Sequence, residues 1–192
     1  MKNMTRLIGA AVMVLAASPV FAQGGQIGVG FGATAPVGKL GDEADPGFVI
    51  DGFGSWPIHG IFALRASGAY DGLRPAEDDR AACKAAGFDC MNRIGRVDGG
   101  VEIGPRESKA RPYGFAEIGA YNLKEEAAVG GLKVSESKTH LGGGFGVGLR
   151  ADLGRRFGVG AEMPIRWWRE KEAGERETYW YFEPNGFVYV RF

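Results

Sequence analysis

The chain has 192 residues, with 23 lysines and arginines against 23 aspartates and glutamates, so its formal net charge is zero. This length suits a single domain, and the charge balance excludes the basic excess of a nucleic-acid-binding protein. After the first 22 residues, no hydrophobic run is long enough to form a transmembrane helix.

The first element in chain order is a leader segment, MKNMTRLIGAAVMVLAASPVFAQ. Lys2 and Arg6 give it a basic start, and an apolar run over residues 7–17 follows. That run is shorter than the roughly 20 apolar residues of a membrane-spanning helix. We therefore expect a secretory signal peptide over residues 1–22, cleaved after Ala22, and one exported domain over residues 23–192.

Most of the remaining chain alternates apolar residues with glycine or polar residues at a period of two, which predicts β-strands. The regular alternations cover residues 27–34, 61–70, 96–104, 140–152, 157–167 and 186–192. Two less regular strands are expected near residues 48–56 and 113–123. Eight strands of about 9–11 residues each are long enough to cross a bilayer at a tilt.

The stretch HLGGGFGVGLRAD at residues 140–152 shows what the two faces of a strand carry. Its glycines lack the G-x-G-x-x-G spacing, and no helical pattern follows, so a phosphate-binding loop is excluded. Leu141, Phe145 and Val147 share one face, and glycine occupies most of the other. A soluble barrel would turn the apolar face inward. Glycine is a poor solvated exterior, so we expect the apolar face to meet lipid and the glycine face to line a small lumen.

The predicted connections alternate between short and long. Short ones fall at residues 57–60, 105–110 and 153–156, and longer ones at residues 41–47, 71–92, 124–138 and 169–177. Outer-membrane barrels have short periplasmic turns and longer extracellular loops. The alternation therefore predicts an antiparallel up-and-down barrel with its short turns in the periplasm.

Charged residues lie on the face opposite the apolar one, where they should point into the lumen. The expected lumen charge network consists of Asp51, Arg65, Arg96, Asp98, Glu102, Glu117, Arg150, Asp152, Glu162 and Arg166. Charges in a confined space must be paired or solvated. We interpret the network as a filling that stiffens the barrel, because small barrels are usually filled by side chains. The alternative is a narrow path for ions or small solutes that opens when the pairs exchange partners.

Aromatic residues gather near the ends of the predicted strands, as they do at the two interfaces of a membrane barrel. The expected aromatic girdle comprises Trp56, Trp167, Trp168, Tyr179, Trp180 and Tyr181.

The long connection at residues 71–92 contains both cysteines, Cys83 and Cys90, and an alanine-rich stretch that predicts a short helix. A disulfide between them is the default in an exported protein. Beyond the leader, the histidines are His59 and His140 alone, and neither has the His-x-Ser spacing of outer-membrane deacylases. We expect no enzyme, catalytic residue, cofactor or metal site. A lipid A-modifying activity through His140 is the weakest alternative.

Several phrases resemble a known family. GVGFGATAPVGKLGDEADPGFVIDGFGSW, RPYGFAEIGAYNL and the final FVYVRF are similar to the small outer-membrane β-barrel proteins related to OmpA, OmpX and the opacity porins. The resemblance implies an eight-stranded transmembrane barrel. It also implies an assembly signal at Val188, Val190 and Phe192, which the barrel-assembly machinery would read, although Pro184 and Gly186 fit that pattern less well.

The resemblance also implies partners and a role. We expect contact with outer-membrane lipid and lipopolysaccharide, no nucleic acid, and a monomer. The opacity proteins suggest a structural or surface-interaction role, in adhesion or recognition, for the charged loops. Loops are where recognition usually occurs, and the sequence identifies no extracellular partner.

Overall fold

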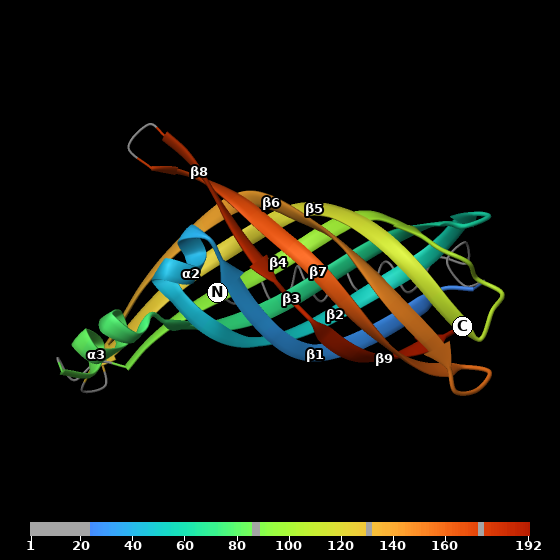
Figure 1. The fold of residues 1–192 in the computed structure, drawn as a ribbon, viewed down its shortest axis with the longest axis horizontal. Coiled ribbons are helices and arrows are strands. Elements are labelled where there is room, and N and C mark those ends of the chain that lie inside the picture. The colour runs from blue at the N-terminus through green and yellow to red at the C-terminus, as the bar shows by residue number, and fades with distance from the viewer. Residues whose placement is uncertain (1–23, 86–88, 130–131, 173–174) are drawn as a thin grey trace.

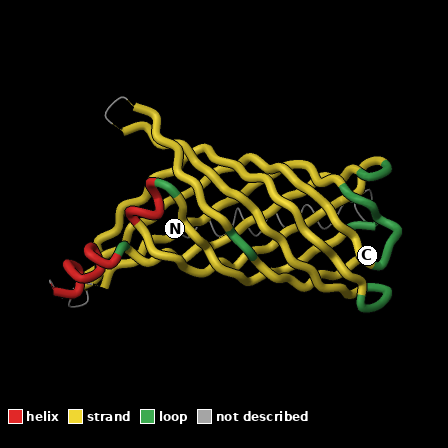
Figure 2. Tube along the Cα trace, viewed as in Figure 1, coloured by secondary structure: helices red, strands yellow, loops and turns green. Residues whose placement is uncertain are grey.

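The computed structural model describes residues 24–85, 89–129, 132–172 and 175–192, so the expected signal peptide at residues 1–22 lies outside the described residues. These residues form a single barrel with two short helices at one end (Figures 1 and 2). The elements are β1 (Gln26–Val37), α2 (Lys39–Glu43), β2 (Ala44–His59), β3 (Phe62–Pro75), α3 (Glu77–Ala85), β4 (Asp89–Ile103), β5 (Ala110–Val129), β6 (Leu132–Asp152), β7 (Phe157–Glu172), β8 (Glu175–Phe182) and β9 (Asn185–Arg191).

The strands close into a ring of eight. From β1 to β8, each strand pairs antiparallel with the next along the chain, and β1 also pairs with β8 and β9, which closes the ring. β8 and β9 are two halves of one strand, because both pair with β7 and β1 in one continuous register. Pro184 has no N–H and interrupts the hydrogen-bond ladder between them. The predicted eight-stranded antiparallel up-and-down barrel is confirmed.

Several strands run further than the alternation predicts. β5 has 20 residues and β6 has 21, and their pairing continues to Val129 opposite Leu132. Much of the predicted loop at residues 124–138 is therefore a strand extension. The same holds for residues 169–177, which belong largely to β7 and β8. Outside the bilayer, an antiparallel ladder can continue while water solvates polar side chains, so the sequence pattern fades before the strand ends.

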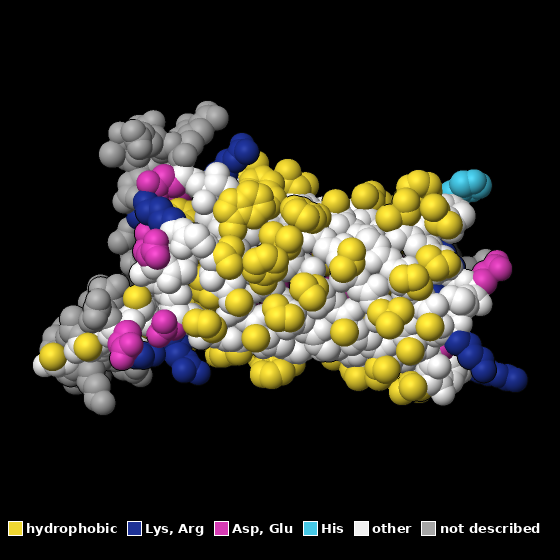
Figure 3. All heavy atoms as spheres, in the orientation of Figure 1, with side chains coloured by type: hydrophobic (Ala, Val, Ile, Leu, Met, Phe, Trp, Pro, Cys, Tyr) yellow, Lys and Arg dark blue, Asp and Glu magenta, His cyan; other side chains and the backbone are white. Residues whose placement is uncertain are grey.

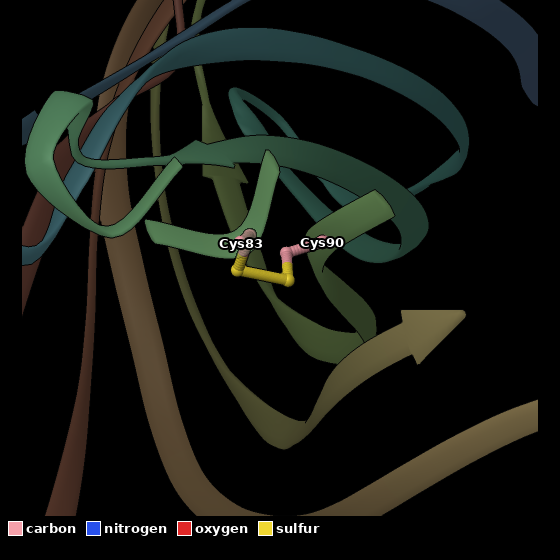
Figure 4. Close-up of a disulfide and its surroundings, with 2 residues drawn as sticks. All are labelled: Cys83 and Cys90. Carbon is pink, nitrogen blue, oxygen red and sulfur yellow. A yellow bond between two sulfur atoms is a disulfide. The ribbon is translucent and has the colours of Figure 1, made fainter. Parts of the chain in front are cut away.

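The helices lie at the end with the long hairpins (Figure 1). α3 occupies the predicted helical stretch, and the disulfide between Cys83 and Cys90 ties it to the start of β4 (Figure 4), which confirms the predicted pairing. No helix in the described part of the chain is long and apolar enough to cross a membrane.

The outer surface of the ring is apolar. Exposed outward-facing side chains include Val29, Phe31, Leu141, Phe145, Val147, Met163 and Val188. Hydrophobic side chains cover the middle of the barrel, and charged ones gather at its two ends (Figure 3). This belt of side chains, with Phe31 65% exposed, is the surface that lipid covers.

The inner glycines leave space for large side chains of neighbouring strands. A Cβ atom at Gly148 would lie 2.4 Å from the ring of Tyr113, and one at Gly158 would lie 2.1 Å from the ring of Tyr189. A Cβ atom at Gly144 would lie 2.6 Å from Cδ of Arg166. The glycine stripe thus accommodates both aromatic rings and long charged side chains.

Candidate functional site: the filled lumen

Arg65 on β3 is the centre of the half of the lumen nearer the short turns, which we call the inner half. Its Nε donates to Glu117 at 3.0 Å, its Nη2 donates to Glu162 at 2.8 Å, and its Nη1 lies 3.4 Å from Glu102. The side chain of Arg65 has no exposed surface. Strands β3, β4, β5 and β7 are therefore joined through one guanidinium group, in addition to their backbone ladders.

Aromatic rings enclose the arginines of this inner half. The guanidinium carbon of Arg65 lies 4.6 Å from the ring centre of Phe53 and 4.4 Å from that of Phe115. Arg150 forms a bidentate pair with Glu102 at 2.6 and 2.7 Å and lies 4.0 Å from the ring centre of Tyr113. Cation–π contacts of this kind are stronger when water is absent.

The outer half of the network is built around Glu183, between β8 and β9. Arg96 donates from Nη2 to both oxygens of Glu183, at 2.6 and 2.8 Å, and Arg166 donates from Nε at 2.9 Å. Arg96 also donates to Asp98 at 2.9 Å. Arg166 donates to Glu117 at 2.7 Å, which connects the outer half to the inner half.

Two of the ten expected lumen residues lie apart from this connected network. Asp51 is buried, with 6% of its surface exposed, and no cation of the described residues lies within 4.0 Å of it. Asp152 lies at the end with the short turns. It accepts from Arg111 at 2.6 Å, from the Tyr189 hydroxyl at 2.6 Å and from Arg191 at 2.5 Å. The other eight are buried and joined to one another by ion pairs.

The sequence analysis missed three buried charged residues of the lumen: Asp71, Arg111 and Glu183. Asp71 lies 3.8 Å from Arg96 and accepts a hydrogen bond from Thr34 at 2.9 Å. All three keep the alternation of their strands but fall beyond the predicted strand ends or beside Pro184. Extending each alternation by a few residues would have found them.

The predicted aromatic girdle is partly wrong. Trp168, Tyr179 and Tyr181 are buried inside the outer end of the barrel, where Trp168 stacks on Tyr179 with ring centres 5.3 Å apart. Trp167 and Trp180 face outward as a pair with ring centres 6.4 Å apart. Alternation explains the error, because adjacent residues of a strand point to opposite faces. Trp56 alternates in register with the outward-facing Ile50 on β2, but it is only 9% exposed and its ring covers Gly54.

A small cavity lies near each end of the lumen. A cavity of about 100 Å³ lies at the outer end, between Leu40, Leu73, Ile94 and Trp168. One of about 10 Å³ lies at the opposite end, beside Arg111 and Arg150. The ion pairs and two clusters of aromatic and aliphatic side chains fill the space between them.

Neither histidine forms a catalytic arrangement with the side chains that the structure describes. His140 Nε2 lies 3.9 Å from Glu170, and the nearby Ser137 hydroxyl bonds with Asn122 instead. His59 is exposed at the end of β2, in the turn to β3. No group of three or more potential metal ligands occurs within the residues that the structure describes.

A closed antiparallel ring with an apolar exterior and a filled polar interior defines the class of small transmembrane β-barrels. The family model "Outer membrane protein beta-barrel domain" matches residues 8–178. The chain therefore belongs to this family and is a protein of the Gram-negative outer membrane.

Solved structures share the fold at low sequence identity. Neisserial surface protein A superposes with a TM-score of 0.60 at 15% identity, covering 88% of this chain and 97% of the other. A major outer membrane protein from Thermus thermophilus gives 0.59 at 12% identity, covering 88% and 99%. Ail, the attachment invasion locus protein of Yersinia pestis, gives 0.50 at 20% identity, covering 88% and 98%. No curated protein sequence matches the chain.

Proposed function

We propose that the protein is a non-catalytic, non-conducting barrel that holds its outer loops rigidly for surface interaction. The observation that carries this proposal is the filled lumen, in which Arg65, Arg96 and Arg166 each contact at least two carboxylates. Ion conduction needs a continuous watery path. Opening one here would separate buried charges, at a cost of several kcal/mol for each pair broken.

The outer end supports the recognition part of the proposal. The β5–β6 and β7–β8 hairpins project past the ring (Figure 1), and the disulfide ties α3 to β4 (Figure 4). An ion pair joins Lys39 on α2 to Glu177 on β8. A rigid scaffold with projecting polar loops is a common arrangement for binding partners. The names of Neisserial surface protein A and of the attachment invasion locus protein of Yersinia pestis point to such a role in those proteins.

The proposed partners follow from the same surfaces. Lipopolysaccharide would contact the outer rim, where Trp167 and Trp180 face outward and the guanidinium carbon of Arg169 lies 5.4 Å from the Trp167 ring centre. The barrel-assembly machinery would read the outward-facing Val188, Val190 and Phe192 during insertion. We propose a monomer, because lipid can cover the whole apolar belt without a second chain.

Single-channel recording in planar bilayers tests the filled lumen. We expect the wild-type protein to give no regular conductance steps. An Arg65→Ala/Arg150→Ala variant that still folds should give measurable steps, which shows that the assay detects an opened lumen. Regular, resolvable openings of the wild-type protein would contradict the proposal and favour the narrow channel.

The proposed absence of catalysis is tested separately. Lipid A mass spectra from cells that express the wild-type protein and from cells that express a His140→Ala variant should be identical. A lipid A species that depends on His140 would contradict it.

A further inference from the structure

Cations gather around the short turns, at the end opposite the helices. We call Arg106, Lys109, Arg155, Arg156 and Arg191 the basic rim. The rim is continuous in space, because the amide of Asp152 donates to the carbonyl of Lys109 at 3.0 Å and the amide of Arg191 donates to the carbonyl of Arg156 at 2.7 Å. Figure 3 shows Lys and Arg side chains projecting from this end.

Most of the basic rim is not neutralised. Arg191 shares Asp152 with Arg111. Across the described ranges, no carboxylate lies within 4.0 Å of Arg106, Lys109, Arg155 or Arg156. Glu107 is the one acidic residue in the sequences of the three short turns, at residues 57–60, 105–110 and 153–156. The rim therefore carries several positive charges that are free to meet an external anion.

The outer end of the barrel differs in this respect. There Lys39 pairs with Glu177, Arg80 pairs with Asp45 at 3.2 Å, and Lys138 lies 3.6 Å from Glu170. Both ends are hydrated and both carry cations, but three exposed cations of the outer end have acidic partners, whereas in the described part of the chain Arg191 alone has one among the five of the basic rim. Solvation of a charged surface alone does not explain this difference.

Exposed apolar side chains lie directly beside the rim cations. Leu153 is 72% exposed in the turn that carries Arg155 and Arg156, and Phe157, which follows them, is 64% exposed. Phe192, next to Arg191, is 48% exposed. Apolar side chains that flank arginines are typical of the boundary between acyl chains and head groups.

We infer that the basic rim binds the phosphate groups of anionic phospholipids in the periplasmic leaflet. The short turns place the rim at that leaflet, which consists of phospholipids. Leu153 and Phe157 would contact the acyl chains while Arg155 and Arg156 reach the phosphates. Each cation near an anionic lipid surface raises the affinity about fivefold. A soluble acidic partner would match the charges but would leave these two apolar side chains exposed to water.

Native mass spectrometry of the folded protein tests this inference. The protein is released from detergent with equal amounts of phosphatidylglycerol and phosphatidylethanolamine that have identical acyl chains. We expect the wild-type protein to retain phosphatidylglycerol in clear excess. An Arg155→Gln/Arg156→Gln variant, altered only in an exposed turn, should lower that excess roughly tenfold or more.

A charge-matched control separates the rim from net charge. Arg74→Gln/Arg169→Gln removes two exposed arginines from the outer end and should leave the excess unchanged. Equal retention of the two lipids by the wild-type protein would overturn the inference and leave a soluble acidic partner as the better explanation. An undiminished excess in the Arg155→Gln/Arg156→Gln variant would overturn it as well.

Discussion

Arg65 shows how single side chains hold the interior together. Replacing it with methionine keeps most of its volume but leaves Glu117, Glu162 and Glu102 without their shared cation. Removing one partner from a buried ion pair costs about 3–5 kcal/mol. We expect the Arg65→Met variant to lose about that much unfolding free energy, measured by urea titration in lipid vesicles.

The control for Arg65 is an exposed pair. Arg80→Met removes the partner of Asp45, where both side chains are about two-fifths exposed, and should cost less than about 1 kcal/mol. Equal losses in the two variants would show that the buried network does not stabilise the barrel beyond a surface ion pair.

The tryptophans at the outer end allow a second test of side-chain direction. Trp180 is 39% exposed on the outer surface, whereas Trp168 is 1% exposed in the interior. In single-tryptophan variants reconstituted with brominated lipid, we expect strong quenching of Trp180 fluorescence and little quenching of Trp168. Similar quenching of both would contradict the corrected placement.

Much of the residue-level picture could be predicted from alternation alone. All ten predicted lumen residues lie on the inward face of their strands, because a period of two is strict within a ladder. The partners within that set could not be predicted, since pairing across the lumen depends on the stagger of the strands around the ring. The prediction of the aromatic girdle was wrong where residues were grouped by their nearness to strand ends and not by alternation.

At the scale of elements, β6 shows most clearly how glycine on the inward face of a strand makes room for the side chains of neighbouring strands. A Cβ atom at Gly146 would lie 2.8 Å from the ring of Phe115 and 2.8 Å from the backbone of Pro164. Because backbone atoms cannot move aside, we expect Gly146→Val to cost about 1–3 kcal/mol of unfolding free energy and to lower the refolding yield.

Gly99 on β4 is the matched control for Gly146. A Cβ atom there would have no atom within 4 Å, since the residue faces outward. Gly99→Val should fold with a normal yield in the same refolding assay, followed by the gel mobility of the unheated protein. A normal yield for Gly146→Val as well would contradict this account of the glycines.

Element boundaries were harder to predict than element types. The sequence pattern identified eight strands, but β5, β6, β7 and β8 continue where alternation between apolar and polar residues ends. Hydrophobic periodicity reports the part of a strand that lies in lipid. Backbone hydrogen bonds hold the extramembrane part together, and these bonds leave no hydrophobic periodicity in a polar sequence.

At the scale of the whole molecule, ladders, ion pairs and aromatic clusters together predict resistance to detergent. We expect the folded protein to keep its structure in cold sodium dodecyl sulfate and to migrate differently before and after boiling. A single band with unchanged mobility would contradict a stable membrane barrel. The Arg65→Met variant should lose its folded band at a lower temperature than the wild-type protein.

The closure of the ring has a kinetic consequence. Every other strand pair is a hairpin between neighbours in the chain, but closure joins Gln26 to Arg191, nearly the whole described chain apart. The entropy lost in closing so large a loop must be offset when β8 and β9 meet β1. Glu183 lies at that junction and binds arginines of β4 and β7. The last strand therefore gains ion pairs with its neighbour β7 and with β4 across the barrel at the step that closes the ring.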